Sequence, residues 1–118
     1  MRYPESMSEH TSERERLTDG DVQERKPQGW WGDDGKLFRL FEFDSYRQGL
    51  DFVVRVAELA EAQNHHPDIT LKYKKVHVEY VTHETNSIVG GVTELDLRGA
   101  EAVNSIFELP GEALSGEG

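Results

Sequence analysis

The sequence predicts an α+β fold in which helices pack on one face of an antiparallel sheet. Apolar residues recur every three or four positions between residues 46 and 63, a spacing typical of an amphipathic helix. Between residues 69 and 81 they alternate with polar residues, as in strands that bury one face. The order of strand, helix, strand, strand and helix contains no internal repeat and indicates an α+β plan.

The first strand is predicted over residues 36–43 (KLFRLFEF), an aromatic-rich run. It follows residues 29–35 (GWWGDDG), whose glycines and aspartates indicate a turn. Ser45 and Gln48 then form a capping pattern in which each side chain satisfies a free backbone N–H at a helix start. A long helix is therefore expected over residues 46–63, and its broad apolar face implies burial under the sheet.

Pro67 prevents this helix from continuing, because proline lacks an N–H and disfavours helical geometry in the residue before it. His65 and His66 are therefore expected just beyond the helix end. Residues 69–73 and 76–81 form the two alternating strands, and the short turn between them predicts a hairpin.

The last helix should follow the glycine pair at positions 90 and 91. Thr93 and Asp96 have the spacing of another capping pattern, and residues 97–107 carry an apolar helical stripe. Asp96 is thus expected near the start of this helix.

The chain of 118 residues is the size of one domain. Residues 1–18 contain few apolar side chains and no helical stripe, so we expect a flexible acidic tail there. The folded domain is expected over residues 19–110, with a short irregular helix near residues 19–25. Residues 111–118 are expected to form a flexible C-terminal tail.

The composition excludes several classes of site. There is no cysteine, which rules out disulfides, thiolate zinc sites and a cysteine nucleophile. No stretch approaches the ~18 apolar residues that a membrane span needs, and no signal peptide is visible, so a soluble cytoplasmic protein is expected. The formal charge of -10 makes nucleic-acid binding improbable. The acidic balance, with five lysines, suits either a high-salt environment or an ordinary acidic protein.

Four of the five histidines lie between positions 65 and 83. Imidazoles can donate or accept protons at neutral pH, so this cluster indicates acid–base chemistry. Simpler interpretations of these histidines also remain open. His77 lies on the polar face of a strand and is more simply structural or solvated. The His65-His66 pair could also cap the helix or lie at the surface, and His10 has no proposed role.

A metal site is a further alternative, because His65, His66, His83 and Glu84 are all possible ligands for zinc or iron. Neighbouring side chains usually point apart, and no H-x-H or H-E-x-x-H spacing is present. We therefore predict no metal.

The sequence resembles the pterin-4a-carbinolamine dehydratases, also known as dimerisation cofactors of a homeodomain transcription factor. The family pattern consists of an acidic residue, His-His-Pro after three residues, an aromatic residue, a histidine and a later aspartate. The matching positions here are Glu61, His65-His66-Pro67, Tyr73, His83 and Asp96. The similarity extends over residues 29–107, including V-A-E-L-A-E-A in the long helix and G-G-V-T-E-L-D before the last helix.

This resemblance implies a four-stranded antiparallel sheet and a cofactor-free hydro-lyase. The reaction would be dehydration of 4a-hydroxytetrahydrobiopterin to quinonoid dihydropterin, in the recycling of tetrahydrobiopterin. Catalytic roles would fall to three histidines: His65 and His83 would be the acid and base, and His66 would orient the substrate. Further substrate contacts and two supporting carboxylates are implied as well. They are Pro67, Thr82 and Glu84 as contacts, and Glu61 and Asp96 as supports.

The resemblance also implies partners. A homodimer or homotetramer is expected, with a pterin as substrate, an aromatic amino acid hydroxylase in the same pathway, and neither nucleic acid nor membrane. The alternative is a non-catalytic dimeric binding or assembly module on the same fold. Two departures from the family stand out: residues 85–89 (TNSIV) lengthen the link before the glycine pair, and the family's first helix is poorly represented between Gly20 and Pro27.

Overall fold

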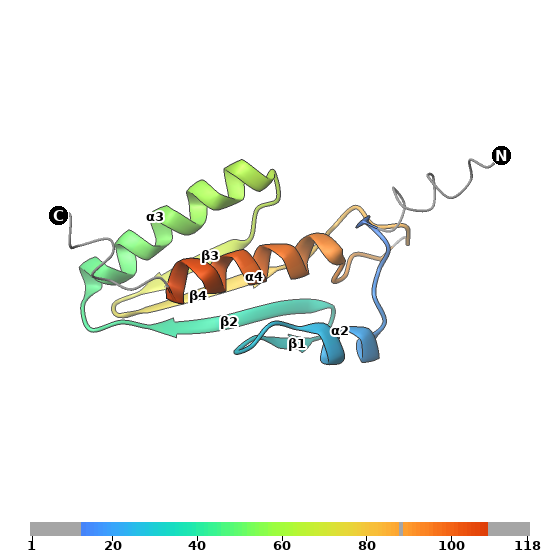
Figure 1. Ribbon diagram of the computed structural model, residues 1–118, viewed down its shortest axis with the longest axis horizontal. Helices are drawn as coiled ribbons and strands as arrows, with labels where there is room; N and C mark the ends of the chain where they lie inside the picture. Colours follow the sequence, from blue (N-terminus) through green and yellow to red (C-terminus); the bar gives the residue numbers. More distant parts are fainter. Residues whose placement is uncertain (1–12, 88, 109–118) are drawn as a thin grey trace.

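The computed structural model describes residues 13–87 and 89–108. Four strands form one antiparallel sheet in the order β1-β2-β4-β3. Helices α3 and α4 lie side by side on one face of this sheet (Figure 1). The predicted α+β fold is therefore confirmed. The elements, in chain order, are α2 (Asp19–Arg25), β1 (Trp31–Asp33), β2 (Lys36–Glu42), α3 (Tyr46–Gln63), β3 (Asp68–Lys72), β4 (Lys75–Tyr80) and α4 (Glu94–Glu108).

Strand β1 is the element that the residue pattern did not show. Its three residues lie in the segment predicted as a turn, and a strand this short cannot display an alternating pattern. Asp34 and Gly35 both have positive φ, 53° and 74°, and they join β1 to β2 as a two-residue hairpin turn. An Asp-Gly pair is a strong signal for such a turn.

The N-terminal part of the described chain is more regular than the sequence indicates. Helix α2 is a true α-helix, because the Thr18 side chain accepts a hydrogen bond from the Asp21 N–H and caps it. Before α2, the Leu17 N–H donates to the Val92 carbonyl over 2.8 Å. Ordered packing therefore begins before Asp19. Residues 1–12 and 109–118 lie outside the described part, so the flexibility of those parts of the predicted tails stays a prediction.

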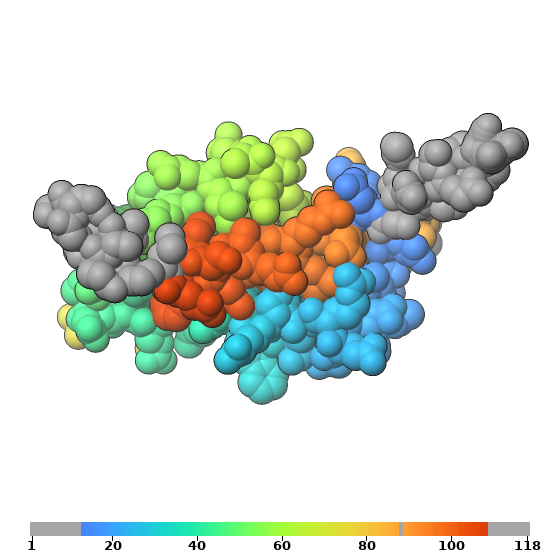
Figure 2. Space-filling view, in the orientation of Figure 1, coloured from blue at the N-terminus to red at the C-terminus, as the bar shows by residue number. Residues whose placement is uncertain are grey.

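The core lies between the sheet and the two long helices. In the space-filling view, α4 (orange to red) lies between α3 (green) and the segment of α2 and β1 (blue), as Figure 2 shows. Phe52 of α3 and Phe107 of α4 both pack on Phe41 of β2, with ring centroids 4.8 Å and 4.9 Å away. The largest fully buried apolar side chains are Trp30, Tyr80, Phe41, Leu37, Val56, Val76, Val78 and Val103.

A buried amide links α4 to the start of the sheet. Asn104 is 8% exposed, and its Oδ1 accepts from the Trp30 Nε1–H and from the Arg39 guanidinium, both over 2.7 Å. Its amide nitrogen donates to the Gln28 carbonyl over 2.9 Å. This one side chain therefore satisfies the buried indole N–H, which otherwise would have no partner here.

Asn104→Leu should destabilise the fold by about 2–4 kcal/mol, because it leaves the Trp30 N–H and part of the Arg39 guanidinium without an acceptor. Asn104→Asp is the comparison variant: it keeps the acceptor oxygen, loses the bond to Gln28 and places a carboxylate beside the Arg39 guanidinium. Urea unfolding of both variants measures the difference. A free energy of unfolding unchanged in the leucine variant would contradict this role of Asn104.

Candidate active site

The end of α3 sets the position of the first predicted site histidine. Asn64 is in the left-handed region with φ 55°, and its N–H bonds to the carbonyls of Ala60 and Glu61. The His65 N–H also bonds to the Ala60 carbonyl, over 3.1 Å. Together these bonds close the helix end in a Schellman-like cap. His65 therefore leaves the helix at a fixed point, as the position of Pro67 predicted.

His65 forms a short hydrogen bond with a buried carboxylate. Its Nε2 lies 2.6 Å from Oδ1 of Asp96, which is fully buried in the first turn of α4. The other carboxylate oxygen, Oδ2, accepts from the Thr82 hydroxyl over 2.7 Å and from the Thr93 N–H over 2.9 Å. The two threonine hydroxyls are 2.8 Å apart. Both oxygens of Asp96 are thus held in place.

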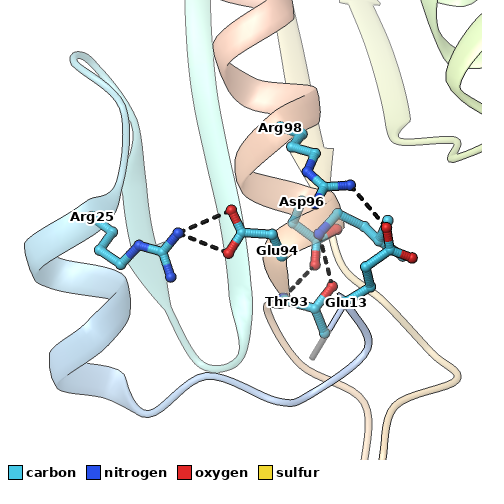
Figure 3. A network of polar contacts seen from close by, with 7 residues as sticks. Glu13, Arg25, Thr93, Glu94, Asp96 and Arg98 are labelled. Carbon is cyan, nitrogen blue, oxygen red and sulfur yellow. Dashed lines mark hydrogen bonds and ion pairs between the residues drawn. The ribbon is translucent and has the colours of Figure 1, made fainter. Parts of the chain in front are cut away.

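Figure 3 shows Thr93 and Asp96 at the start of α4, between two ion pairs that hold this helix end to the N-terminal segment. The Arg25 guanidinium of α2 lies 2.7 Å from Glu94, and the Arg98 guanidinium lies 3.1 Å from Glu13. The Thr93–Asp96 capping pattern expected from the sequence is confirmed, and the same carboxylate that caps α4 also contacts His65.

This arrangement selects one tautomer of His65. Asp96 accepts hydrogen bonds from Thr82 and Thr93, so it acts as an acceptor toward His65 as well. Neutral His65 then carries its proton on Nε2 and leaves the lone pair of Nδ1 free. A proton taken up at Nδ1 produces an imidazolium that faces the carboxylate, as in carboxylate–histidine pairs of hydrolases. This arrangement allows His65 to accept a proton at Nδ1.

Tyr80, the last residue of β4, lies against the face of the His65 ring. The ring centroids are 5.6 Å apart and the planes differ by 15°. Burial raises the pKa of the Tyr80 phenol well above its usual value, and the negative charge of Asp96 adds to the rise. The phenol is therefore neutral throughout the ordinary pH range. Tyr80 lies in the predicted strand of residues 76–81, and the residue pattern there gives no sign of a role in the site.

His66 points to a different carboxylate. Its Nε2 lies 2.6 Å from Oε2 of Glu61, one turn earlier on α3, and the two side chains are 54% and 78% exposed. An exposed pair of this kind contributes little to stability. Glu61 therefore pairs with His66, and the exposed His66 ring remains accessible to a ligand.

His83 and Glu84 follow β4 and are exposed at the surface. The loop that they begin is held by the N-terminal segment. The Asn86 N–H donates to the Arg14 carbonyl over 2.9 Å, and the Asn86 side-chain oxygen accepts from the Arg16 N–H over 3.0 Å. Asn86, in the longer segment that precedes the glycine pair, thus attaches this loop to the N-terminal segment.

The structure brings the predicted residues together only in part. His65, Asp96 and Thr82 form one connected group, and Thr82 is 2% exposed, so it lies behind Asp96 with both hydroxyl contacts directed inward. His66 and His83 are the chain neighbours of His65 and Thr82, and both are exposed; within residues 13–87 and 89–108 no hydrogen bond joins their side chains to that group. Pro67 is half-buried.

His77 is separate from this group. It stacks on Phe38 with ring centroids 5.7 Å apart, whereas its neighbours Val76 and Val78 are buried against the helices. Because side chains alternate along a strand, His77 lies on the face of the sheet away from α3 and α4. This position agrees with the interpretation of His77 as a structural or solvated residue.

The remaining surface offers two further observations. A hollow of about 360 Å³ opens between α2, the β1–β2 turn and residues 89–92, and it contains none of the predicted site residues. In the part of the chain that the structure describes, no three histidine, cysteine or acidic side chains gather in a way that could hold a metal ion. The same described part contains no helix long and apolar enough to span a bilayer.

Comparison with known proteins identifies the family. Residues 13–106 match the profile of the family described as pterin 4 alpha carbinolamine dehydratase. The chain belongs to this family. A protein from Haloarcula marismortui that is provisionally named a pterin-4-alpha-carbinolamine dehydratase is 37% identical to this chain over 92 residues. The match covers 78% of this chain and 96% of that protein. The expected family resemblance is therefore confirmed.

Two solved structures share the family fold. The transcriptional coactivator/pterin dehydratase from Brucella melitensis superposes with a TM-score of 0.68 at 35% identity, covering 77% of this chain and 97% of that one. A pterin dehydratase-like protein, identified as a RuBisCO assembly factor in the alpha-carboxysome, gives a TM-score of 0.53 at 23% identity. That match covers 69% of this chain and 89% of the other, and it shows the fold alone.

Asp96→Asn should reverse the tautomer of His65. Thr82 and Thr93 both donate at the Oδ2 position, so the amide oxygen of the asparagine should occupy it. The amide NH₂ then faces His65 and donates to Nε2, which moves the ring proton to Nδ1. Heteronuclear NMR spectra of the imidazole nitrogens distinguish the two tautomers at a pH where His65 is neutral.

Glu61→Gln is the matched control for this experiment, because it changes the partner of His66 and leaves His65 unaltered. His65 should keep its Nε2–H tautomer in that variant. A proton on Nδ1 of His65 in the unsubstituted protein, or an unchanged tautomer in Asp96→Asn, would show that Asp96 does not determine the tautomer of His65.

Proposed function

We propose that this chain catalyses the dehydration of 4a-hydroxytetrahydrobiopterin, or a closely related 4a-hydroxytetrahydropterin, to the quinonoid dihydropterin. The observation that supports it is the 2.6 Å pair of His65 and Asp96, held at the end of α3 beside the exposed His66. Family membership supplies the substrate class.

The reaction removes a hydroxyl from C4a and a proton from N5. The N5 lone pair assists the loss of the hydroxyl, so the protein needs only a base for the N5 proton and an acid for the leaving oxygen. We assign the base to Nδ1 of His65, since Asp96 holds its other nitrogen. His83 is the acid that protonates the hydroxyl, which leaves as water. Atoms and charge balance without a cofactor or a metal.

The other predicted residues take supporting roles. His66, together with Pro67 and Glu84, would bind and orient the pterin ring at the accessible end of α3. The resemblance implies that Thr82 contacts the substrate. We assign it instead the role of holding Asp96, because its hydroxyl already donates to that carboxylate. Glu61 would act through His66.

The proposal extends to the setting of the reaction. The chain would act in the cytoplasm as a homo-oligomer in a pterin recycling pathway that serves an aromatic amino acid hydroxylase. The second candidate function is a non-catalytic assembly module, and the fold shared with the RuBisCO assembly factor is the observation in its favour. The presence of His65, His66 and His83 favours the enzyme.

His65→Ala and His83→Ala should each lower kcat for carbinolamine dehydration by about 100-fold or more, since 100-fold is the lower end of the range for general acid–base catalysis. Stopped-flow measurement with the purified protein tests this. His77→Ala is the matched control, since it removes an imidazole from the opposite face of the sheet. A chelator should leave the rate of the unsubstituted protein unchanged.

Three results would overturn parts of this proposal. Full kcat in either histidine variant would remove that residue from the acid–base pair. Loss of activity with chelator and its return with zinc or iron would require a metal mechanism. Absence of any dehydration by the unsubstituted protein would favour the assembly module.

Self-association should be visible by sedimentation at micromolar concentration, as a dimer or a tetramer. Strand β3 forms an edge of the sheet, and Tyr46 and Val54 of α3 are 50% and 48% exposed. Unpaired strand edges and exposed apolar side chains favour pairing between copies. Val54→Arg should shift the population toward smaller species if the α3 face contributes. A monomer across this concentration range would contradict the prediction.

A further inference from the structure

Tyr80 has surroundings that fix its ring more firmly than ordinary core packing requires. The side chain is fully buried at the end of β4, and its hydroxyl has no hydrogen-bond partner within residues 13–87 and 89–108. One face of the ring lies nearly parallel to the His65 imidazole. The Trp30 ring lies 5.9 Å away on another side.

Helix α4 closes the remaining side of Tyr80 through a glycine. A Cβ at position 99 would lie 2.5 Å from Cζ of Tyr80 and 2.9 Å from its hydroxyl oxygen, so only glycine leaves room for the phenol there. The helix backbone therefore approaches the ring closely. Tyr80 is held between α4, Trp30 and the His65 ring, and it has little freedom to shift.

The hydrogen bond to Asp96 alone does not determine the orientation of His65. A single contact between Nε2 and Oδ1 fixes one point of the imidazole and leaves the ring free to pivot about that contact. A flat partner against the ring face removes this pivot, because stacked aromatic rings prefer particular separations and angles. The 15° angle between His65 and Tyr80 matches such a contact.

We propose that Tyr80 is a positioning residue for His65: its buried ring sets the plane of the imidazole, and Asp96 sets which nitrogen carries the lone pair. The two contacts together fix the direction in which Nδ1 presents its lone pair. The catalytic part of this inference rests on the proposed dehydration, in which His65 is the base. The structural part concerns the ring plane and stands apart from that reaction.

We expect the effect on His65 to come from the aromatic ring of Tyr80 and not from its hydroxyl. The hydroxyl has no partner among the described residues, so its burial costs free energy that its removal should recover. A phenylalanine keeps the stacked face, whereas a leucine fills much of the same space without it. These two substitutions therefore separate positioning from packing.

The experiment compares Tyr80→Phe with Tyr80→Leu by kinetics and by NMR of the histidine rings. Tyr80→Phe should keep kcat within about two-fold and raise the urea midpoint. Tyr80→Leu should lower kcat by about ten-fold with KM within about two-fold, as expected when a catalytic group is misplaced while binding is retained. Its His65 ring-proton resonances should move downfield as the ring current is lost, while those of His66 and His83 stay in place.

A second measurement covers the case in which Tyr80→Leu fails to fold. In the unsubstituted protein and in Tyr80→Phe, nuclear Overhauser contacts should join the aromatic protons of residue 80 to those of the His65 ring. Their absence in both proteins would overturn the proposal.

Two further outcomes would also overturn it. A folded Tyr80→Leu with unchanged kcat and unchanged His65 resonances would make Tyr80 a packing residue only. A loss of kcat in Tyr80→Phe as large as in Tyr80→Leu would assign the effect to the hydroxyl. If the unsubstituted protein shows no dehydration, the proposed function fails, and the NMR comparison still decides whether Tyr80 holds the plane of His65.

Discussion

The buried carboxylate of Asp96 is the interaction on which both the fold and the candidate site depend. An ionised carboxylate without partners in a protein interior is strongly unfavourable, so its burial requires that every oxygen be hydrogen-bonded. Three donors meet this requirement, and each comes from a different place in the chain: His65 after α3, Thr82 after β4, and Thr93 before α4. The ends of three elements are thereby brought to one point.

Around this point the site combines a fixed part with an accessible part. His65 is 14% exposed and is held by Asp96 at one edge and by Tyr80 on one face. His66 and His83 lie at the surface. A base must have a defined direction when the proton moves, whereas groups that receive a ligand can adjust as it binds. In the proposed reaction the base, His65, lies in the fixed part, whereas the acid, His83, and the substrate-binding His66 lie in the accessible part.

The sequence predicted those features that depend on neighbouring residues. The bounds of α3, residues 46–63, agree with the structure because Ser45 and Pro67 act locally on the helix ends. The cap of α4 by Thr93 and Asp96 was predicted for the same reason. The family pattern named His65 and Asp96, but their contact joins positions 31 residues apart and follows only from how α3 and α4 pack. Tyr80 gave no signal beyond its place on a core face, because its contact with His65 depends on two chain segments that meet only in three dimensions.

The double use of Asp96 affects how the history of this fold can be inferred from sequences. Thr93 and Asp96 cap the start of α4, and Thr82 holds the same carboxylate, whatever chemistry takes place beside them. A lineage that abandoned catalysis would still be under selection to retain the carboxylate and its donor at position 65, while the exposed His66 and His83 would be free to change. Retention of Asp96 in a distant homologue therefore records inheritance of the fold, and the loss of His66 and His83 is the change that would mark the loss of catalysis.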